Sequence, residues 1–193
     1  MSKNITPKGY KVPPLSRAHV FARADKLRSD FGMSQTLYFD IVRFIESILP
    51  MCDSDFDFKV VEDHELPHQL ALTLPDKKLM VVRHSIYRGA VGNCGRDRFT
   101  LAHEVGHYIL HPGVPAAYAK DGSHEYYEDS EWQANNFAGE LLAPIYLLDG
   151  MGTIQISEDF GVSHTTANIQ RDHATKRKAA TSSGRLTLPQ GCK

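Results

Sequence analysis

Apolar residues recur at helical spacing in two stretches near the start of the chain. Residues 16–31 are predicted to form a helix that Gly32 ends, and residues 34–49 a second helix that Pro50 stops. The apolar stripe of the second stretch comprises Leu37, Ile41, Phe44, Ile45 and Ile48. Residues 1–14 contain three prolines and a glycine and are expected to form an extended arm.

The pattern then changes to the two-residue alternation of β-strands over residues 55–61, 70–74 and 78–82. A short turn, Pro75-Asp76-Lys77, separates the last two stretches, so we expect them to form a hairpin. Helices combined with a small sheet predict an α+β domain over residues 15–150.

Two longer helices follow. The first, over residues 98–111, carries apolar side chains around most of its circumference, which indicates a buried helix, and Pro112-Gly113 ends it. The second lies within residues 128–144, where Asp129 or Ser130 can cap it and Pro144 stops it. Its apolar stripe, which can pack on the first helix, comprises Ala134, Phe137, Ala138, Leu141 and Leu142.

The first of these helices contains the run His103-Glu104-Val105-Gly106-His107. Residues four apart lie on one face of an α-helix, so the two imidazoles can bind one tetrahedral metal ion, usually zinc. Glu104 beside them can take a proton from a metal-bound water. The motif is short and the chain holds 10 histidines. On the motif alone, two structural histidines and a solvated glutamate are therefore the alternative.

A catalytic zinc site needs a third protein ligand and leaves the fourth position for water. His111 continues the series, but it lies about 12 Å along the helix axis from His103, too far to share one ion. We therefore expect His111 to cap the helix or to pack behind the ligands.

The second helix offers a better third ligand. Glu131 can supply a carboxylate oxygen, and Asn135, one turn further on, can hydrogen-bond a ligand histidine and fix its tautomer. Glu128 and Glu140 compete with Glu131, although a solvated helix face is the simpler interpretation for both.

Two runs, RDRFTLAHEVGHYILH and EWQANNFAGELLAP, resemble the ImmA/IrrE family of small bacterial and phage metallopeptidases in order, spacing and flanking apolar residues. The resemblance implies that His103, His107 and Glu131 are zinc ligands and that Glu104 is the general base. It also implies a gluzincin-like peptidase that cleaves a partner repressor in response to DNA damage or another stress. Single-stranded DNA is a candidate activating ligand.

In zincins a strand beside the active-site helix can bind the substrate backbone as an additional strand. We expect residues 79–84 to be this edge strand. The predicted fold is therefore an α+β zincin-like core with N-terminal helices, a small mixed sheet, two metal-bearing helices and a C-terminal helical pair.

A glycine-rich stretch, residues 87–97, precedes the histidine helix and is expected to form a flexible loop. Cys94 lies in it between two glycines, nine residues before His103. A thiolate there can reach the open fourth zinc position and hold the enzyme latent. Asn93-Cys94-Gly95 loosely resembles the cysteine-switch segment of matrix metalloproteinase propeptides. A loop thiol without a role is the alternative.

Residues 112–127 connect the two metal-bearing helices and are expected to border the cleft. His124, Tyr126 or Tyr127 can donate to the oxyanion of a tetrahedral intermediate. Packing is the alternative role for the tyrosines, and the sequence does not select among the three residues.

After Gly150 the pattern predicts two short helices around Phe160-Gly161-Val162-Ser163, with Ser163 as the N-cap of the second. This pair, residues 151–178, resembles a helix-turn-helix. Its candidate DNA or partner contacts are Thr165, Asn168, Arg171 and the basic run Lys176-Arg177-Lys178. A pair that only covers the core is the alternative. Residues 179–193 are rich in Ser, Thr and Gly and are expected to be disordered.

Charge and composition narrow the function classes. The 193 residues carry a net charge of −1, so there is no overall basic signal for nucleic acid. No apolar run approaches the length of a membrane span, and the N-terminus has no apolar signal core. Three scattered cysteines, Cys52, Cys94 and Cys192, fit a reducing compartment. We therefore expect a cytoplasmic protein without a membrane partner.

Together these features predict a zinc-dependent endopeptidase that cleaves a specific cytoplasmic protein and that Cys94 can hold latent. The family resemblance suggests a transcriptional repressor as the substrate. The alternative from another class is a nucleic-acid-binding regulatory module whose zinc is structural.

Overall fold

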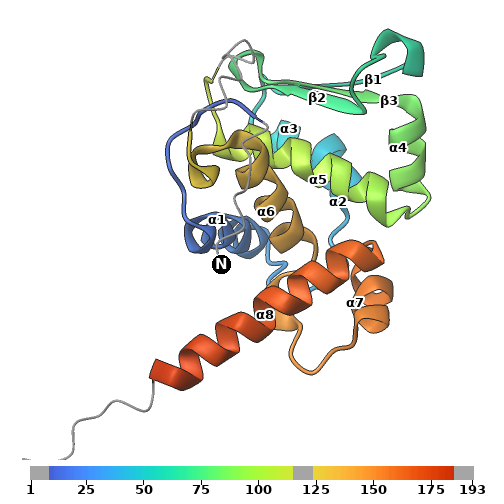
Figure 1. The fold of residues 1–193 in the computed structure, drawn as a ribbon. Coiled ribbons are helices and arrows are strands. Elements are labelled where there is room, and N and C mark those ends of the chain that lie inside the picture. Colours follow the sequence, from blue (N-terminus) through green and yellow to red (C-terminus); the bar gives the residue numbers. More distant parts are fainter. Residues whose placement is uncertain (1–8, 115–123, 185–193) are drawn as a thin grey trace, which may run out of the picture.

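The computed structural model describes residues 9–114 and 124–184, arranged as shown in Figure 1. The helices are α1 (Arg17–Asp30), α2 (Ile41–Arg43), α3 (Leu49–Cys52), α4 (His84–Val91), α5 (Gly95–Leu110), α6 (Ser130–Leu142), α7 (Thr153–Phe160) and α8 (His164–Gly184). The strands are β1 (Asp57–Val61), β2 (Ala71–Leu74) and β3 (Leu79–Arg83). The predicted α+β class is confirmed.

Helices α5 and α6 form the centre of the fold, with the sheet on one side of α5 and α1 packed on α6 (Figure 1). A Cβ on Gly106 of α5 would lie 3.1 Å from the Cα of Ala134 in α6. The missing side chain therefore lets the two backbones approach closely between His103 and His107. The two helices also contribute many buried apolar side chains to the core: Leu101, Ala102, Val105, Phe137, Ala138, Leu141 and Leu142.

The sheet has the strand order β1-β3-β2, with β1 parallel and β2 antiparallel to β3. The predicted hairpin of β2 and β3 is confirmed. The prediction that residues 79–84 form the edge strand is wrong, because β3 pairs with a strand on each side and His84 begins α4. The edge strand beside α5 is β2, where Thr73 Oγ1 donates to the Glu104 carbonyl oxygen at 3.1 Å.

The backbone of β2 presents hydrogen-bonding groups on the side away from β3. Arg83 N–H donates to the Leu70 carbonyl oxygen at 3.1 Å, so these two residues form a hydrogen-bonded pair. Such pairs alternate along an antiparallel ladder. Leu72 therefore bonds to β3, while the N–H and C=O groups of Ala71 and Thr73 point toward the open edge.

The predicted helix over residues 34–49 starts later and ends later than expected. Helical structure begins at Ile41, after Asp40 Oδ1 accepts the Arg43 N–H at 3.1 Å. It continues through Pro50 to Cys52 by way of a wider π-type turn, in which the Leu49 N–H donates to the Phe44 carbonyl. This wider turn changes the hydrogen-bond register just before Pro50, so a residue without an N–H is tolerated there.

The stretch before α5 is also more ordered than predicted. Residues 84–91 form α4, and only residues 92–94 connect it to α5. The flexible loop expected over residues 87–97 is therefore a short connection between two helices.

The predicted helical pair is present as α7 and α8, joined by Gly161 with a φ of 61°. As predicted, Ser163 caps α8, since its Oγ accepts the Thr166 N–H at 3.2 Å. The fully buried Arg98 of α5 connects the pair to the core by donating to the carbonyl oxygens of Gly161 and Phe39, both at 2.9 Å.

Helix α8 extends to Gly184, so residues 179–184, expected to be disordered, are helical. The remainder of the predicted tail and residues 1–8 of the predicted arm lie outside the described residues. Within the two described ranges, no helix combines the length and apolarity needed to cross a bilayer.

The described part of the N-terminal arm lies along the start of α6. Gly9 N–H donates to Asp129 Oδ2 at 2.8 Å, and Tyr10 N–H donates to Ser130 Oγ at 3.2 Å. Ser130 N–H donates in return to the Tyr10 carbonyl oxygen at 3.1 Å. These contacts join segments 120 residues apart in sequence and place Tyr10 beside the histidines of α5.

Candidate metal centre

Three potential ligand side chains converge where α5 and α6 approach. His103 Nε2 and His107 Nε2 lie 2.9 Å apart on one face of α5. Glu131, in the first turn of α6, places Oε2 at 3.3 Å from His103 Nε2 and Oε1 at 3.3 Å from His107 Nε2. Among the described residues, these three form the group whose ligand atoms all lie within 4.8 Å of one another.

The dimensions of this cluster fit a zinc ion. Zinc binds imidazole nitrogen and carboxylate oxygen at about 2.0–2.2 Å, so tetrahedral ligand atoms lie about 3.3–3.6 Å apart. The separations of 2.9, 3.3 and 3.3 Å are close to that spacing. Two histidines and one glutamate, with a fourth position left open, are the donor set of a catalytic rather than a structural zinc site.

The charge of the cluster also suits a cation. Burial favours the neutral form of Glu131, but hydrogen bonds with His103 and His107 outweigh it and hold the pKa of Glu131 well below its usual range. Burial likewise lowers the pKa of His103, but Glu131, Glu104 and Asn135 raise it to a larger extent. The net field at this point therefore favours positive charge.

A chain of hydrogen bonds sets the tautomer of His107. Gln133 donates through Nε2 to the carbonyl oxygens of Pro13 and Tyr127, at 2.9 and 2.8 Å, so its Oε1 must accept. That oxygen lies 3.2 Å from His111 Nε2, which must carry the proton. His111 Nδ1 then accepts from His107 Nδ1–H at 3.2 Å. The Nε2 lone pair of His107 is therefore left for the metal.

His111 Nδ1 can accept this hydrogen bond because the His111 ring stays neutral. Burial, followed by the neighbouring His107, lowers the pKa of His111 to about 4. The structure thus places His111 behind His107, as predicted, and not among the ligands. Sequence reasoning did not assign a role to Gln133, whose two carbonyl partners are visible only in the fold.

Asn135 plays the corresponding part for His103. Its Oδ1 lies 3.1 Å from His103 Nδ1, so the ring donates there and turns its Nε2 lone pair toward Glu131 and His107. This is the contact predicted for Asn135 from its position one turn after Glu131.

The cluster opens into a cavity of about 450 Å³, which we call the metal cavity. Glu104 lines it together with the three ligands and residues 69–73, which lead into the edge strand β2 and form most of it. The remaining lining residues are Tyr10 and Thr100. A polypeptide added to β2 would therefore pass over the metal ligands and Glu104.

Tyr10 is a residue of this cavity that the sequence did not reveal. Its ring centroid lies 6.2 Å from that of His107 and 5.9 Å from that of His111. Burial, with the nearby charges of Glu131 and Glu104, raises the pKa of Tyr10 to about 12. The phenol therefore remains protonated at neutral pH and can donate a hydrogen bond.

The three residues predicted as oxyanion donors do not line the metal cavity. His124 is buried, with Nε2 3.1 Å from Asp129 Oδ2. Tyr126 and Tyr127 contact each other, and Tyr126 also packs against Trp132. The segment bearing the three residues packs beside the start of α6, so the alternative role of packing describes the two tyrosines.

The structure does not bring Cys94 to the metal cluster, so the prediction that Cys94 is a fourth ligand is wrong. Cys94 is exposed and precedes the first turn of α5. It lies about 13 Å along the helix axis from His103. The reason is that the preceding residues form α4 and continue almost directly into α5. Cys192 lies outside the described residues.

The two competing carboxylates also lie elsewhere. Glu128 forms an ion pair with Lys11 at 3.4 Å. Glu140 is fully buried, where its carboxylate accepts from the Ile145 N–H and from Gln170 Nε2, both at 3.1 Å. The expectation of a solvated face is therefore wrong for Glu140, which connects α6 to α8.

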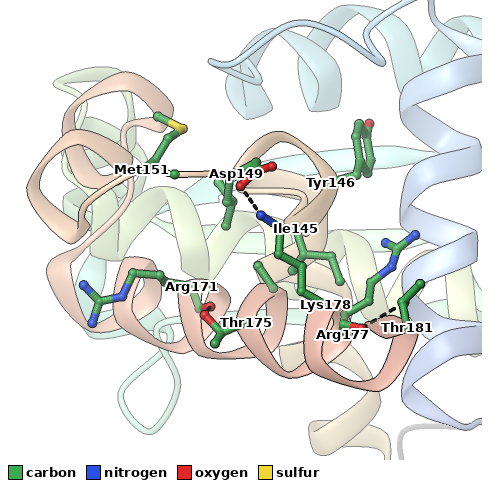
Figure 2. A pocket seen from close by; sticks show the side chains of 12 residues that line it. Ile145, Tyr146, Asp149, Met151, Arg171, Thr175, Arg177, Lys178 and Thr181 are labelled. Carbon is green, nitrogen blue, oxygen red and sulfur yellow. Dashed lines mark hydrogen bonds and ion pairs between the residues drawn. The ribbon is translucent and has the colours of Figure 1, made fainter. Parts of the chain in front are cut away.

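A separate cavity of about 690 Å³ lies between residues 145–151 and α8. Figure 2 shows Lys178 reaching across it to form an ion pair with Asp149, with Arg171 and Arg177 at opposite ends. Part of the predicted basic contact surface of α8 therefore borders this cavity, well away from the metal ligands.

Comparison with protein families matches residues 93–170 to the Peptidase_M78 family, described as the IrrE N-terminal-like domain. The matched range contains all three candidate ligands and Glu104. A comparison with curated proteins gives no match. Over residues 93–170 the chain is therefore similar to the M78 peptidase family, in agreement with the resemblance to ImmA/IrrE proteins.

Proposed function

We propose that this protein is a zinc-dependent endopeptidase in which His103, His107 and Glu131 hold the metal. The observation that carries the proposal is the cluster of three ligand atoms within 4.8 Å, open to a cavity that an edge strand borders. The match of residues 93–170 to a peptidase family supports the reaction class.

A zinc ion at this position would supply Lewis-acid activation of a water molecule and of the scissile carbonyl. Glu104 follows His103 in the chain and lines the same cavity. In the proposed mechanism Glu104 accepts the proton of the attacking water and returns it to the leaving amine.

The remaining groups of the cavity position the substrate. Ala71 and Thr73 direct backbone groups to the open edge of β2, where they can bind the substrate as an added strand. The Tyr10 hydroxyl donates to the carbonyl oxygen as negative charge develops on it. Tyr10 thus replaces the three donors predicted from the sequence.

The proposed substrate is a protein, specifically a transcriptional repressor that is cleaved in a stress or DNA-damage response. Single-stranded DNA is the proposed activator. The support for both is the resemblance to the ImmA/IrrE family, and the experiment below does not depend on either.

The test compares zinc-loaded wild type with Glu104→Gln on a peptide mixture prepared from a whole proteome, with new termini identified by mass spectrometry. We expect Glu104→Gln to keep its zinc and to lose roughly 10²–10⁴-fold in cleavage rate, the usual contribution of a general base. Glu158→Gln, an exposed change on α7, is the control and should behave as wild type. Cleavage by Glu104→Gln at the wild-type rate would refute the mechanism.

The second candidate function is a nucleic-acid-binding regulatory module with a structural zinc. The exposed positions of Thr165 and Arg171 on α8, after a capped turn, favour it. Against it, Asn168 already accepts a hydrogen bond from Thr153 Oγ1 at 2.7 Å. This function predicts duplex DNA binding that weakens steeply with salt and with Arg171→Ala, independently of Glu104.

A further inference from the structure

A large cavity lies next to the metal centre, on the side of α5 and α6 that faces α8. We call it the Phe99 cavity; its volume is about 730 Å³. The residues that line it include Phe99, Thr100, Asn135, Gly139, Ile169 and Gln170. Thr100 also lines the metal cavity, and Asn135 is the residue that hydrogen-bonds His103. The two cavities therefore share Thr100, and Asn135 connects the Phe99 cavity to the candidate ligand His103.

The wall of the Phe99 cavity is suited to an apolar ligand. Ile169 on α8 is 50% exposed, although most large apolar side chains of this fold are buried. Phe99, half-buried on α5, also lines the cavity. An exposed apolar side chain in the wall of a concave site beside a reaction centre is typical of a binding pocket.

Gly139, which lines this cavity, lets α6 and α8 pack closely together. A Cβ on Gly139 of α6 would lie 2.9 Å from Gln170 Oε1, so α8 packs tightly on α6 at this point. Gln170 is held there by its hydrogen bonds to Glu140 and to the Ala143 carbonyl oxygen. The cavity is therefore bounded by fixed helices.

The charged side chains that line this cavity are positive. Arg17 and Arg96 line it, whereas no acidic side chain does so among the described residues. Arg17 Nε donates to Asn136 Oδ1 at 3.1 Å, which holds its guanidinium at the cavity. His173 also lines it, but burial, with the charges of Arg17 and Lys176, lowers the pKa of His173 to about 4. At neutral pH the two arginines therefore supply the charge, and they complement a carboxylate.

We propose that the Phe99 cavity binds a large apolar side chain of the protein substrate, such as Phe, Leu or Met, close to the scissile bond. Arg17 and Arg96 select an acidic residue near that side chain. The inference rests on the proposed peptidase function and names the class of sequence that the site accepts. A substrate strand on β2 brings its flanking residues past Thr100 and Asn135 to this cavity.

The first test is cleavage profiling of the zinc-loaded protein on the proteome-derived peptide mixture. Wild type should cut at sites enriched in large apolar residues at one fixed position. Ile169→Trp, which fills the cavity, should slow cleavage at such sites roughly tenfold or more, while Ile154→Trp, an exposed change on α7, should not. Arg96→Glu should lower the rate at sites with a nearby acidic residue roughly two- to fivefold.

The second test measures binding without catalysis. Zinc-loaded Glu104→Gln protein with labelled isoleucine methyl groups is titrated with acetyl-Ala-Phe-Glu-Ala-amide and with acetyl-Ala-Ala-Glu-Ala-amide. The Ile169 methyl resonance should shift with the first peptide and much less with the second. Ile154 lies outside the cavity and is 63% exposed, so the chemical shift of its methyl group should stay constant.

The outcomes separate this inference from the proposed function. Cleavage without an apolar preference, and without a shift at Ile169, overturns the inference and leaves the peptidase. A shift at Ile169 in a protein whose wild type cleaves nothing supports the cavity and refutes the peptidase. A shift that depends on protein concentration alone assigns the cavity to a second copy of the chain and also overturns the inference.

Discussion

At the scale of single residues, metal binding depends on which nitrogen of each histidine carries the proton. Gln133 must accept from His111, and His111 must then accept from His107, because the donors of Gln133 are both in use. The tautomer of His107 is thus set by a residue two hydrogen bonds away. Removing a partner of this kind typically lowers metal affinity roughly 10–100-fold.

This relay predicts that His111→Phe weakens zinc binding although His111 is not a ligand. The substitution keeps a ring in the buried position but removes the acceptor for His107 Nδ1–H. We expect the zinc dissociation constant, measured by competition with a chelator, to rise roughly 10–100-fold. His64→Phe, at an exposed position, should leave it unchanged. Equal affinity in the two variants would show that the relay has no influence on the site.

Tyr10 leads to a prediction about rate. Tyr10→Phe removes the one hydroxyl that the described part of the N-terminal arm places at the metal cavity. We expect kcat to fall roughly 10²-fold while zinc content and KM change little, because the donor acts mainly on the developing oxyanion. Tyr126→Phe, exposed and outside the cavity, is the matched control. A larger effect on KM than on kcat would place Tyr10 in substrate binding instead.

At the scale of elements, sequence reasoning predicted β2 as a strand but assigned the open edge to residues 79–84 instead. Alternation identified all three strands and the hairpin, because those signals are local. It could not show that β1 pairs in parallel with β3, since β2 lies between these two strands in the chain. The same limit applies to Cys94, whose distance from His103 depends on α5 starting at Gly95.

The register of β2 distinguishes two proline substitutions. Ala71→Pro removes an N–H that points to the open edge, whereas Leu72→Pro removes one that bonds to β3. We expect Ala71→Pro to keep the fold and to raise KM severalfold, and Leu72→Pro to lower the melting temperature markedly. Circular dichroism melts and peptide cleavage measure the two effects. An unchanged KM in Ala71→Pro would contradict strand addition at this edge.

At the scale of the whole molecule, the local signals were sufficient for the two central helices, and contacts distant in sequence supplied the rest. The spacing of His103 and His107 and the position of Glu131 predicted the cluster, since α5 and α6 are regular and adjacent. The arm that carries Tyr10 could not be placed, because it is held by hydrogen bonds to Asp129 and Ser130, 120 residues away. The roles of Gln133 and Gly106 could not be predicted either, because they depend on contacts with Pro13 and Ala134, which are distant in sequence.

The junction of α1, α6 and α8 makes the stability of the fold depend on pH. Burial and the neighbouring Asp25 raise the pKa of Glu140 to about 8. Burial also raises the pKa of Asp25, one of whose carboxylate oxygens, Oδ1, has no hydrogen-bond partner in the described structure. The folded state therefore holds a proton that the unfolded chain releases near pH 4.5, and stability falls as pH rises from there to about 8.

Asp25→Asn tests this pH dependence. The amide can donate to Glu140, whose carboxylate then has donors on every side and can ionise without repulsion. We expect Asp25→Asn to raise the free energy of unfolding at pH 8 by about 1 kcal/mol or more, with a smaller change at pH 5. Denaturant melts at the two pH values measure it, with the exposed Asp159→Asn as the control. An equal change at both pH values would contradict the shared proton.

The measurement that tests the central claim most directly is zinc content by mass spectrometry in wild type, Glu131→Gln and Glu128→Gln. The two variants lose neighbouring carboxylates, of which only Glu131 faces the histidines. We predict about one zinc per chain in wild type and in Glu128→Gln, and a loss of most of it in Glu131→Gln. No zinc in wild type, or equal zinc in all three proteins, would contradict the proposed metal centre.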